Sequence, residues 1–219
     1  MEIVIFGAPG AGKGTQAKII SQKLSIPHIS TGDILRSAVA AGTELGKQVE
    51  GIMARGELVS DELMAKLVEE MLESDKCKNG FILDGYPRTL NQVQFFEEIR
   101  RKHNLNNSCL LNIQVDFEVI FKRLTSRMLC LNCNAIVTES EIKTEDTCPK
   151  CGSVGTLIKR KDDTPEVVEK RLAVYKESTE PILNYYSENP TLTVINVNGD
   201  QPVENVTSDI MKNLEVCNK

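Results

Sequence analysis

The sequence predicts an α/β fold in which a doubly wound, parallel, five-stranded sheet carries helices on both faces. Short apolar runs alternate along the chain with longer segments of helical periodicity, and this alternation is typical of βαβ units. We expect these runs to be strands buried on both faces. With 219 residues, 41% of them hydrophobic, the chain is long enough to enclose such a sheet.

Five apolar runs are the expected strands. The first, EIVIF, leads directly into a glycine-rich loop, and the second, PHIS, is the shortest. In chain order the expected strands are 2–6, 27–30, 81–85, 110–116 and 191–197.

Helical periodicity predicts the elements between the strands. Apolar residues recur at helical spacing in 14–24 and 203–214, and Ser60 is expected to cap a helix with an acidic first turn. A further helical pattern runs from 166 to 187, and within it Pro181 cannot donate a backbone hydrogen bond. We therefore expect a kink or a break at this proline.

Two stretches interrupt the alternation. Residues 30–59 form a polar helical segment punctuated by glycine, and residues 127–163 combine four cysteines with short β-like runs. The sequence therefore predicts a core of residues 1–29, 60–126 and 164–219 that carries two inserted segments.

The net charge and the hydropathy of the chain limit the kinds of partner that it is expected to bind. The chain has 26 basic and 31 acidic side chains, a net charge of −5, so its overall field repels polyanions and disfavours nucleic acid or an acidic membrane as a partner. The first strand lacks the basic start of a signal peptide, and no apolar run approaches the roughly 18 residues that span a bilayer. We expect a cytoplasmic protein.

The stretch GAPGAGKGTQ, residues 7–16, predicts a phosphate-binding loop. Gly7, Gly12 and Lys13 fit the GxxxxGK pattern, in which backbone N–H groups and a helix N-terminus surround phosphate oxygens. The alternative is a glycine-rich turn that precedes a lysine by chance, but the strand before it and the helix after it favour the phosphate loop. Gly14 stands where such loops carry Ser or Thr, so the hydroxyl comes one place later, at Thr15.

Four of the seven cysteines form two CxxC pairs separated by fourteen residues: Cys130, Cys133, Cys148 and Cys151. Four thiolates complete a closed tetrahedral shell, so the spacing predicts one structural Zn²⁺ per chain. A disulfide or a thioredoxin-like redox pair is the less favoured alternative, because neither CxxC opens a helix after a strand. A metal crosslink also suits a segment too short to enclose its own core.

Several motifs together resemble the nucleoside monophosphate kinases, and in particular the adenylate kinase family in its long form with a zinc-bearing lid. The resemblance covers essentially the whole chain. It rests on GxPGxGKGTQ, STGDILR (30–36), GFILDGYPRTLNQ (80–92), RLTSR (123–127), KRKDD (159–163) and EKRL (169–172).

This resemblance implies a P-loop fold in which residues 30–59 bind AMP and residues 127–163 close over ATP as a lid. It assigns ATP binding to Gly10, Ala11, Gly12, Lys13, Gly14, Thr15, Arg123, Arg127, Ile136, Val137 and Gln201. It assigns AMP binding to Thr31, Gly32, Arg36, Glu57, Leu58, Val59, Gly85, Tyr86, Pro87, Arg88, Gln92, Arg160 and Arg171. It assigns catalysis to Lys13, Arg88, Arg123, Arg160 and Arg171. Ile136 and Val137 depart from the more polar or aromatic pair that the family usually carries.

The residues themselves support parts of this assignment. Arg123 and Arg127 are four apart in an expected helix, so both would point the same way and would attract an anion; two solvated surface arginines remain the alternative. Asp84 ends an apolar strand, from which it can hold Mg²⁺ through water or only begin a turn. His28 and His103 lie outside the motifs, and a phosphate acceptor with a second pKa of about 6 needs no general base.

Two rival functions stay open at this point. A kinase for UMP, CMP or GMP would share the loop, although Thr31 and Gln92 match positions that contact adenine in the family. A zinc-ribbon module that binds nucleic acid or protein could instead be attached to a P-loop ATPase, but the segment lacks the aromatic residues of a stacking surface. We expect ATP, AMP and ADP as substrates, Mg²⁺ as cofactor and a monomeric enzyme.

Overall fold

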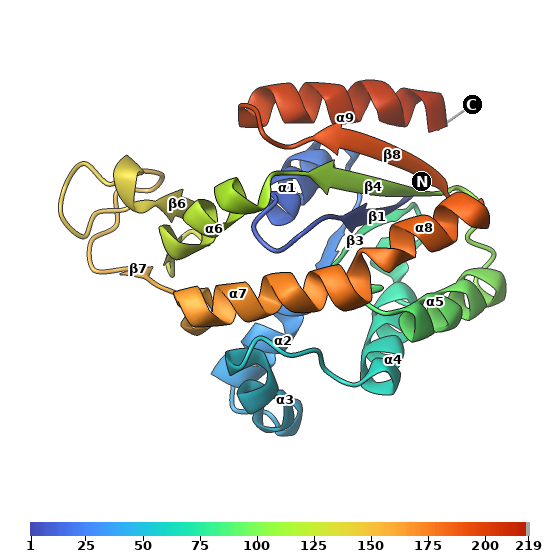
Figure 1. Cartoon of the computed structure of the whole chain (residues 1–219), viewed down its shortest axis with the longest axis horizontal. Helices are drawn as coiled ribbons and strands as arrows, with labels where there is room; N and C mark the ends of the chain where they lie inside the picture. The colour runs from blue at the N-terminus through green and yellow to red at the C-terminus, as the bar shows by residue number, and fades with distance from the viewer. Residues whose placement is uncertain (218–219) are drawn as a thin grey trace.

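The computed structural model describes residues 1–217, and within them five parallel strands form one sheet. The strands lie in the order β2-β3-β1-β4-β8, which confirms the predicted doubly wound architecture (Figure 1). Their bounds are β1 Glu2–Phe6, β2 His28–Ser30, β3 Phe81–Asp84, β4 Ser108–Gln114 and β8 Thr193–Asn198. The predicted strand at 110–116 therefore starts and ends two residues earlier, and the last strand starts two residues later.

Helices cover both faces of this sheet. On one face, α1 (Lys13–Leu24) and α9 (Val203–Cys217) pack against the strands; on the other lie α4 (Asp61–Leu72), α5 (Leu90–Lys102) and α8 (Pro181–Glu188) (Figure 1). Ser60 precedes α4 as predicted, but its hydroxyl makes no capping hydrogen bond. The acidic first turn of Asp61 and Glu62 still interacts favourably with the helix dipole.

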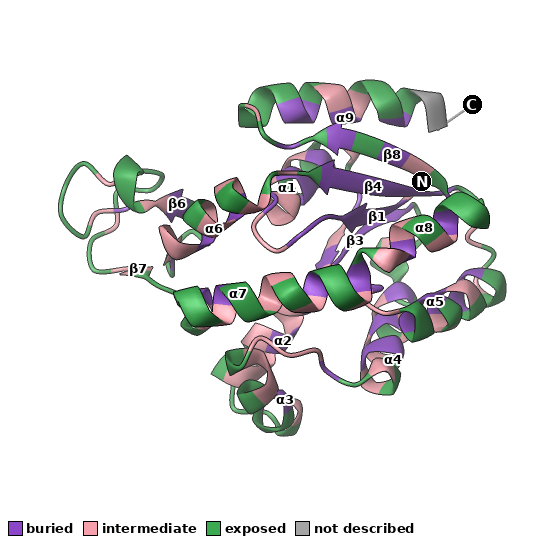
Figure 2. Cartoon of the chain, in the orientation of Figure 1, coloured by how far each residue is buried: buried purple, intermediate pink, exposed green. Residues whose placement is uncertain are grey.

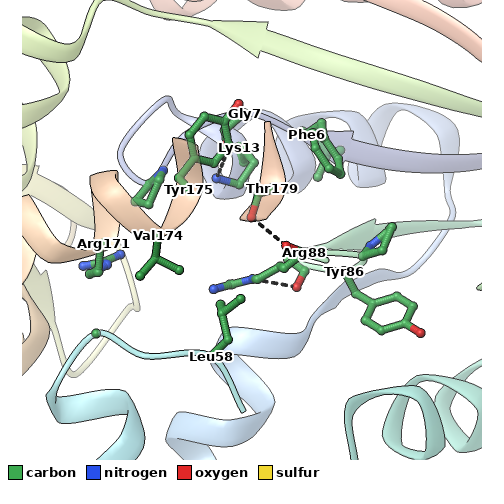
Figure 3. Close-up of a pocket in the computed structure, with 15 residues that line it drawn as sticks. Phe6, Gly7, Lys13, Leu58, Tyr86, Arg88, Arg171, Val174, Tyr175 and Thr179 are labelled. Atoms are coloured by element: carbon green, nitrogen blue, oxygen red, sulfur yellow. Dashed lines mark hydrogen bonds between the residues drawn. The ribbon is translucent and has the colours of Figure 1, made fainter. Parts of the chain in front are cut away.

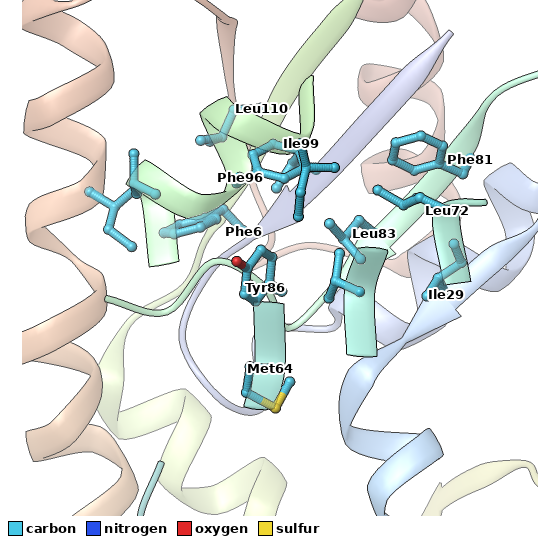
Figure 4. Close-up of a cluster of buried hydrophobic side chains, with 14 of the residues drawn as sticks. Phe6, Ile29, Met64, Leu72, Phe81, Leu83, Tyr86, Phe96, Ile99 and Leu110 are labelled. Carbon is cyan, nitrogen blue, oxygen red and sulfur yellow. The ribbon is translucent and has the colours of Figure 1, made fainter. Parts of the chain in front are cut away.

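The core consists of apolar side chains from the strands and from these helices. Ile3 pairs in register with Ile82 and Cys109, and all three are buried. The larger cluster lies on the face of α4, α5 and α8, with Phe6, Leu83 and Phe96 among its members (Figure 4). Figure 2 shows this burial concentrated in the strands. The sheet is thus a rigid base on which the carboxyl ends of the strands can position a site.

The two interrupting segments project from the sheet, residues 127–163 at the left of Figure 1 and residues 30–59 at its bottom. Residues 30–59 contain α2 (Thr31–Ala40) and α3 (Glu44–Ala54), as the helical pattern predicts. Residues 127–163 contain a three-stranded antiparallel sheet in the order β6-β5-β7. Its strands are β5 Arg127–Cys130, β6 Ile136–Thr138 and β7 Leu157–Ile158.

The helical pattern with Pro181 becomes α7 (Pro165–Val174), a π-helical turn (Tyr175–Thr179) and α8. The proline has no N–H, and just before it the Glu180 N–H bonds the Tyr175 carbonyl at 2.9 Å, five residues back. The predicted irregularity at Pro181 is confirmed, and it takes the form of a widened turn. One further helix, α6 (Phe117–Thr125), precedes the cysteine segment, and 3₁₀ turns occupy Asp75–Cys77, Glu139–Glu141 and Lys161–Asp163. None of the helices in the described part of the chain is long and apolar enough to cross a membrane.

Candidate functional site

The glycine-rich loop joins β1 to α1 at the carboxyl edge of the sheet. Gly7, Gly10 and Gly12 all have positive φ, and a Cβ on Gly7 would lie 2.5 Å from the Ile113 carbonyl oxygen, so the tight turn needs glycine. Inside the loop, the Lys13 Nζ donates to the carbonyls of Gly7 and Ala8 at 2.8 and 2.9 Å. The ammonium is therefore held by neutral partners beside the N-terminus of α1, where an anion is favoured.

A cavity of 380 Å³ opens beside this loop and is lined by the core and both inserted segments. Every residue predicted to bind ATP lines it except Val137, which is fully buried inside the cysteine segment. Alternation along β6 explains the difference, because neighbouring strand residues face opposite sides. Ile136, next to it, is 41% exposed and lines the cavity.

A second cavity, of 80 Å³, lies between the core and the segment of α2 and α3. Most residues predicted to bind AMP line it: Thr31, Gly32, Arg36, Glu57, Leu58, Val59, Gly85, Arg88, Gln92 and Arg171. Of the remaining three, Arg160 lines the large cavity, whereas Tyr86 and Pro87 line a third cavity of 60 Å³ next to Lys13. Gly85, Arg88 and Arg171 are common to all three cavities.

Positively charged side chains predominate in the walls of these cavities. Burial lowers the pKa of Lys13 to about 8, against the opposing effect of Asp84, and nearby Arg88 and Arg171 lower it further. Burial likewise lowers the pKa of Arg88, and burial with Arg127 and Arg36 lowers the pKa of Arg160 to about 10. Figure 3 shows Lys13, Arg88 and Arg171 around the smallest cavity. Several cations brought together with little water form a site that attracts a polyanion.

Two carboxylates organise part of this wall. Asp163 accepts from Arg127 Nη2 at 2.6 Å and from Arg171 Nη1 at 2.9 Å, and Asp162 pairs with Arg160 and Arg171 at 3.1 Å each. Both aspartates belong to the KRKDD motif of the sequence (159–163). They bind arginines of the cavity wall, and Asp163 is only 6% exposed.

The helical geometry proposed for Arg123 and Arg127 is wrong. The helix α6 ends at Thr125, and Arg127 opens β5, where it pairs with Thr138. Arg123 contacts the Gly199 carbonyl at 3.2 Å, and Arg127 turns to Asp163. Both arginines nevertheless line the large cavity, because the chain reverses at the start of the cysteine segment.

Asp84 ends β3 and lines the large cavity together with Lys13 and Thr15. Its carboxylate lies 3.3 Å from the His28 Nε2, a contact between neighbouring strands that the sequence analysis missed. No local pattern predicts this contact, because His28 begins β2 and is in register with Ile82, two residues before Asp84. A hard carboxylate beside a phosphate loop fits an Mg²⁺ ion held through water.

The four predicted zinc ligands come together in the cysteine segment, with all ligand atoms within 4.8 Å of one another. The Sγ atoms of Cys130 and Cys151 are 3.8 Å apart, as are those of Cys133 and Cys148. A tetrahedron with Zn–S bonds of about 2.3 Å has edges of about 3.8 Å, so the cluster fits Zn²⁺. Hydrogen bonds from Ser153 and Thr156 lower the pKa of Cys130, whereas, against a backbone hydrogen bond from Ala135, burial and the neighbouring thiols raise the pKa of Cys133.

Comparison with known proteins agrees with this arrangement. A family model described as "Adenylate kinase" matches residues 5–191. The chain is 46% identical over 221 residues to an adenylate kinase of Petrotoga mobilis, covering 100% of both chains. It is 44% identical to the adenylate kinases of a Thermoanaerobacter species, over 216 residues, and of Archaeoglobus fulgidus, over 217 residues, covering 98% of each chain in both comparisons.

Proposed function

Because this chain belongs to the adenylate kinase family of enzymes, we propose that it transfers a phosphoryl group reversibly from ATP to AMP, giving two ADP. The observation that carries this proposal is the wall shared by the cavities. Gly85, Arg88 and Arg171 border both the cavity of the phosphate loop and the cavity of α2 and α3. Two nucleotides placed in these cavities would meet phosphate to phosphate at that wall.

The residues of the wall suit an in-line transfer without a general base. Lys13 and the arginines Arg88, Arg123, Arg160 and Arg171 would neutralise the charge that spreads over the transferred group. They would also hold two mutually repelling anions in line, which supplies much of the rate acceleration. Asp84 and Thr15 would hold Mg²⁺, which would supply positive charge to stabilise the phosphates of ATP.

Residues 30–59 and 127–163 are proposed as the AMP-binding insert and the lid, and 1–29, 60–126 and 164–219 as the core. The lid contributes Arg127 and Arg160 to the lining of the large cavity beside the phosphate loop, so its closure would exclude water as a competing acceptor. One Zn²⁺ per chain, held by the four cysteines, would crosslink the lid. Positions 218 and 219 of the core range lie outside the described residues.

We further propose a monomeric, cytoplasmic enzyme that acts on nucleotides and has no nucleic-acid or membrane partner. The net charge of −5 supports the exclusion of polyanions. The four lid cysteines lie in the geometry of a metal site and not of two disulfides, as suits a reducing compartment.

Incubation with MgATP and AMP tests the function directly, with ADP measured by chromatography. We expect ADP with AMP as acceptor and far less product with UMP, CMP or GMP. Replacing Lys13 by Met should lower kcat by roughly 100-fold or more, because a charge at the transferred group is lost. Lys23→Met, an exposed change on the same helix, is the control. A chain that makes no ADP but shifts nucleic acid in a gel would support the zinc-ribbon rival instead.

A further inference from the structure

The π-helical turn between α7 and α8 packs against the shared wall of the site. It buries Tyr175 and Thr179, each 8% exposed, and both line the smallest cavity together with Lys13 and Arg88. Turns of this kind occur mostly at functional sites, because the extra residue redirects side chains that a regular helix would place elsewhere. The turn therefore raises the question of which side chain it redirects, and toward what.

The redirected side chain is that of Thr179. Its Oγ1 donates a hydrogen bond to the Arg88 carbonyl oxygen at 2.9 Å, across 91 residues of sequence (Figure 3). Threonine hydroxyls in helices commonly bond the carbonyl four residues back, as Thr125 does with Phe121 at 2.9 Å. Thr179 bonds across to another element instead.

Arg88 is held at two further points. Its backbone N–H donates to the Gln92 Oε1 at 2.7 Å, and its guanidinium Nε donates to the Gly85 carbonyl at 2.8 Å. Both of these contacts come from within a few residues along the chain, so they move with the loop that carries Arg88. The Thr179 hydrogen bond connects that loop to the helix that also carries Arg171.

From this geometry we infer that Thr179 is a positioning residue that fixes Arg88, and with it the phosphate of the acceptor nucleotide. The inference rests on the proposed function. The geometry requires a hydroxyl group on residue 179. Serine should therefore preserve the function of Thr179, whereas valine should not. Without the Thr179 hydroxyl, the Arg88 carbonyl loses its hydrogen-bond donor and the loop that carries Arg88 can shift. The Arg88 guanidinium then no longer holds the acceptor phosphate in line for transfer.

Thr179→Val and Thr179→Ser test the inference. We expect Thr179→Val to lower kcat/KM for AMP by about tenfold, since small displacements of positioning groups cost up to about 100-fold, while KM for ATP stays within about twofold. Thr179→Ser should retain most of the activity. Ser108→Ala removes another buried hydroxyl, which donates to the Glu2 carboxylate at 2.9 Å and lies near the Leu105 carbonyl at the amino end of β4, away from the site. This control should change thermal stability without a selective effect on AMP.

A double-mutant cycle separates positioning from general destabilisation. AMP dissociation constants are measured by calorimetry for the wild type, Thr179→Val, Arg88→Ala and the double variant. If Thr179 acts through Arg88, the valine weakens AMP binding in the wild type and adds nothing when Arg88 is already alanine. An equal loss in both backgrounds, an equal loss for ATP and AMP, or wild-type behaviour of Thr179→Val overturns the inference. A wild-type protein that makes no ADP overturns the proposed function and this inference with it.

Discussion

The surroundings of Lys13 disfavour the positively charged form of its side chain. Its burial and the nearby arginines lower its pKa to about 8, although Asp84 partly compensates. The pKa of Lys13 stays low only while its Nζ contacts neutral carbonyl groups. A phosphate bound at the Nζ would favour the charged form and raise this pKa. The affinity of the loop for ATP should therefore depend on pH near neutrality.

We predict that ATP binding weakens as pH rises through about 8. Below this value Lys13 is charged and affinity is flat; above it, binding must first protonate the lysine, so the dissociation constant should rise toward about tenfold per pH unit. Calorimetric titration between pH 6.5 and 9.5 measures this dependence. Arginine stays protonated throughout that range, so Lys13→Arg should remove it. A wild-type curve that stays flat to pH 9.5 would contradict the assignment.

Among the elements, the lid depends most on its metal ligands. The three short strands of the lid enclose a small interior. Among the described residues of the lid, the buried apolar side chains are Val137 and the two zinc-ligand cysteines Cys130 and Cys148. Leu131 and Val154 remain 58% and 69% exposed. A segment with so small an interior cannot offset its conformational entropy without a crosslink.

Removing zinc should loosen the lid and leave the α/β core folded. With a chelator or in Cys148→Ser, we expect the midpoint of thermal unfolding to fall by at least about 5 °C, a loss of roughly 2 kcal/mol in a protein of this size. Calorimetry gives the midpoint, metal analysis gives the zinc content and circular dichroism follows the core. Cys77→Ser, outside the cluster, should keep one zinc per chain. A protein purified without metal, or calorimetry indifferent to chelation, would refute the zinc lid.

At the scale of the whole molecule, ion pairs join the lid, the insert and the core. Lys161 of the lid lies 3.5 Å from Glu50 of α3, and Lys170 of α7 lies 2.7 Å from Glu57. On the opposite side, the Lys18 Nζ donates to the Asn134 carbonyl of the lid at 3.0 Å. These contacts describe an arrangement in which the inserted segments meet over the site.

Reversing the charge at Glu50 should disfavour that arrangement. Exposed pairs contribute about 1 kcal/mol or less, so Glu50→Lys should raise KM for both nucleotides by roughly two- to fivefold. The charge-swapped combination of Glu50→Lys with Lys161→Glu should restore the wild-type values. Glu44→Lys on the same helix, where Glu44 pairs with Lys47, should have no such effect. Steady-state kinetics at low salt measures KM for both nucleotides in each variant. If the charge swap does not restore KM, the Glu50–Lys161 contact does not contribute to closure.

The sequence alone determined the parts of this protein that depend on neighbouring residues. The phosphate loop, the five strands, the irregularity at Pro181 and the two CxxC pairs can be predicted because turn chemistry, periodicity and ligand spacing act over a few positions. The expected burial of every strand on both faces is wrong for β8, which lies at the edge of the sheet and exposes Thr193, Asn196 and Asn198. Nearly all residues that the motif resemblance assigns to nucleotide binding line one of the three cavities, since loops and strand ends carry them.

Only the tertiary structure decided the contacts between distant segments. The sequence placed Arg127 on a helix, whereas the fold turns it onto a strand beside Asp163. It also gave no sign that His28 lies against Asp84, 56 residues away, or that Thr179 meets Arg88, 91 residues away. Such pairs follow from how strands order themselves and helices pack across the sheet. Those choices minimise the energy of the whole chain, and no local pattern records them.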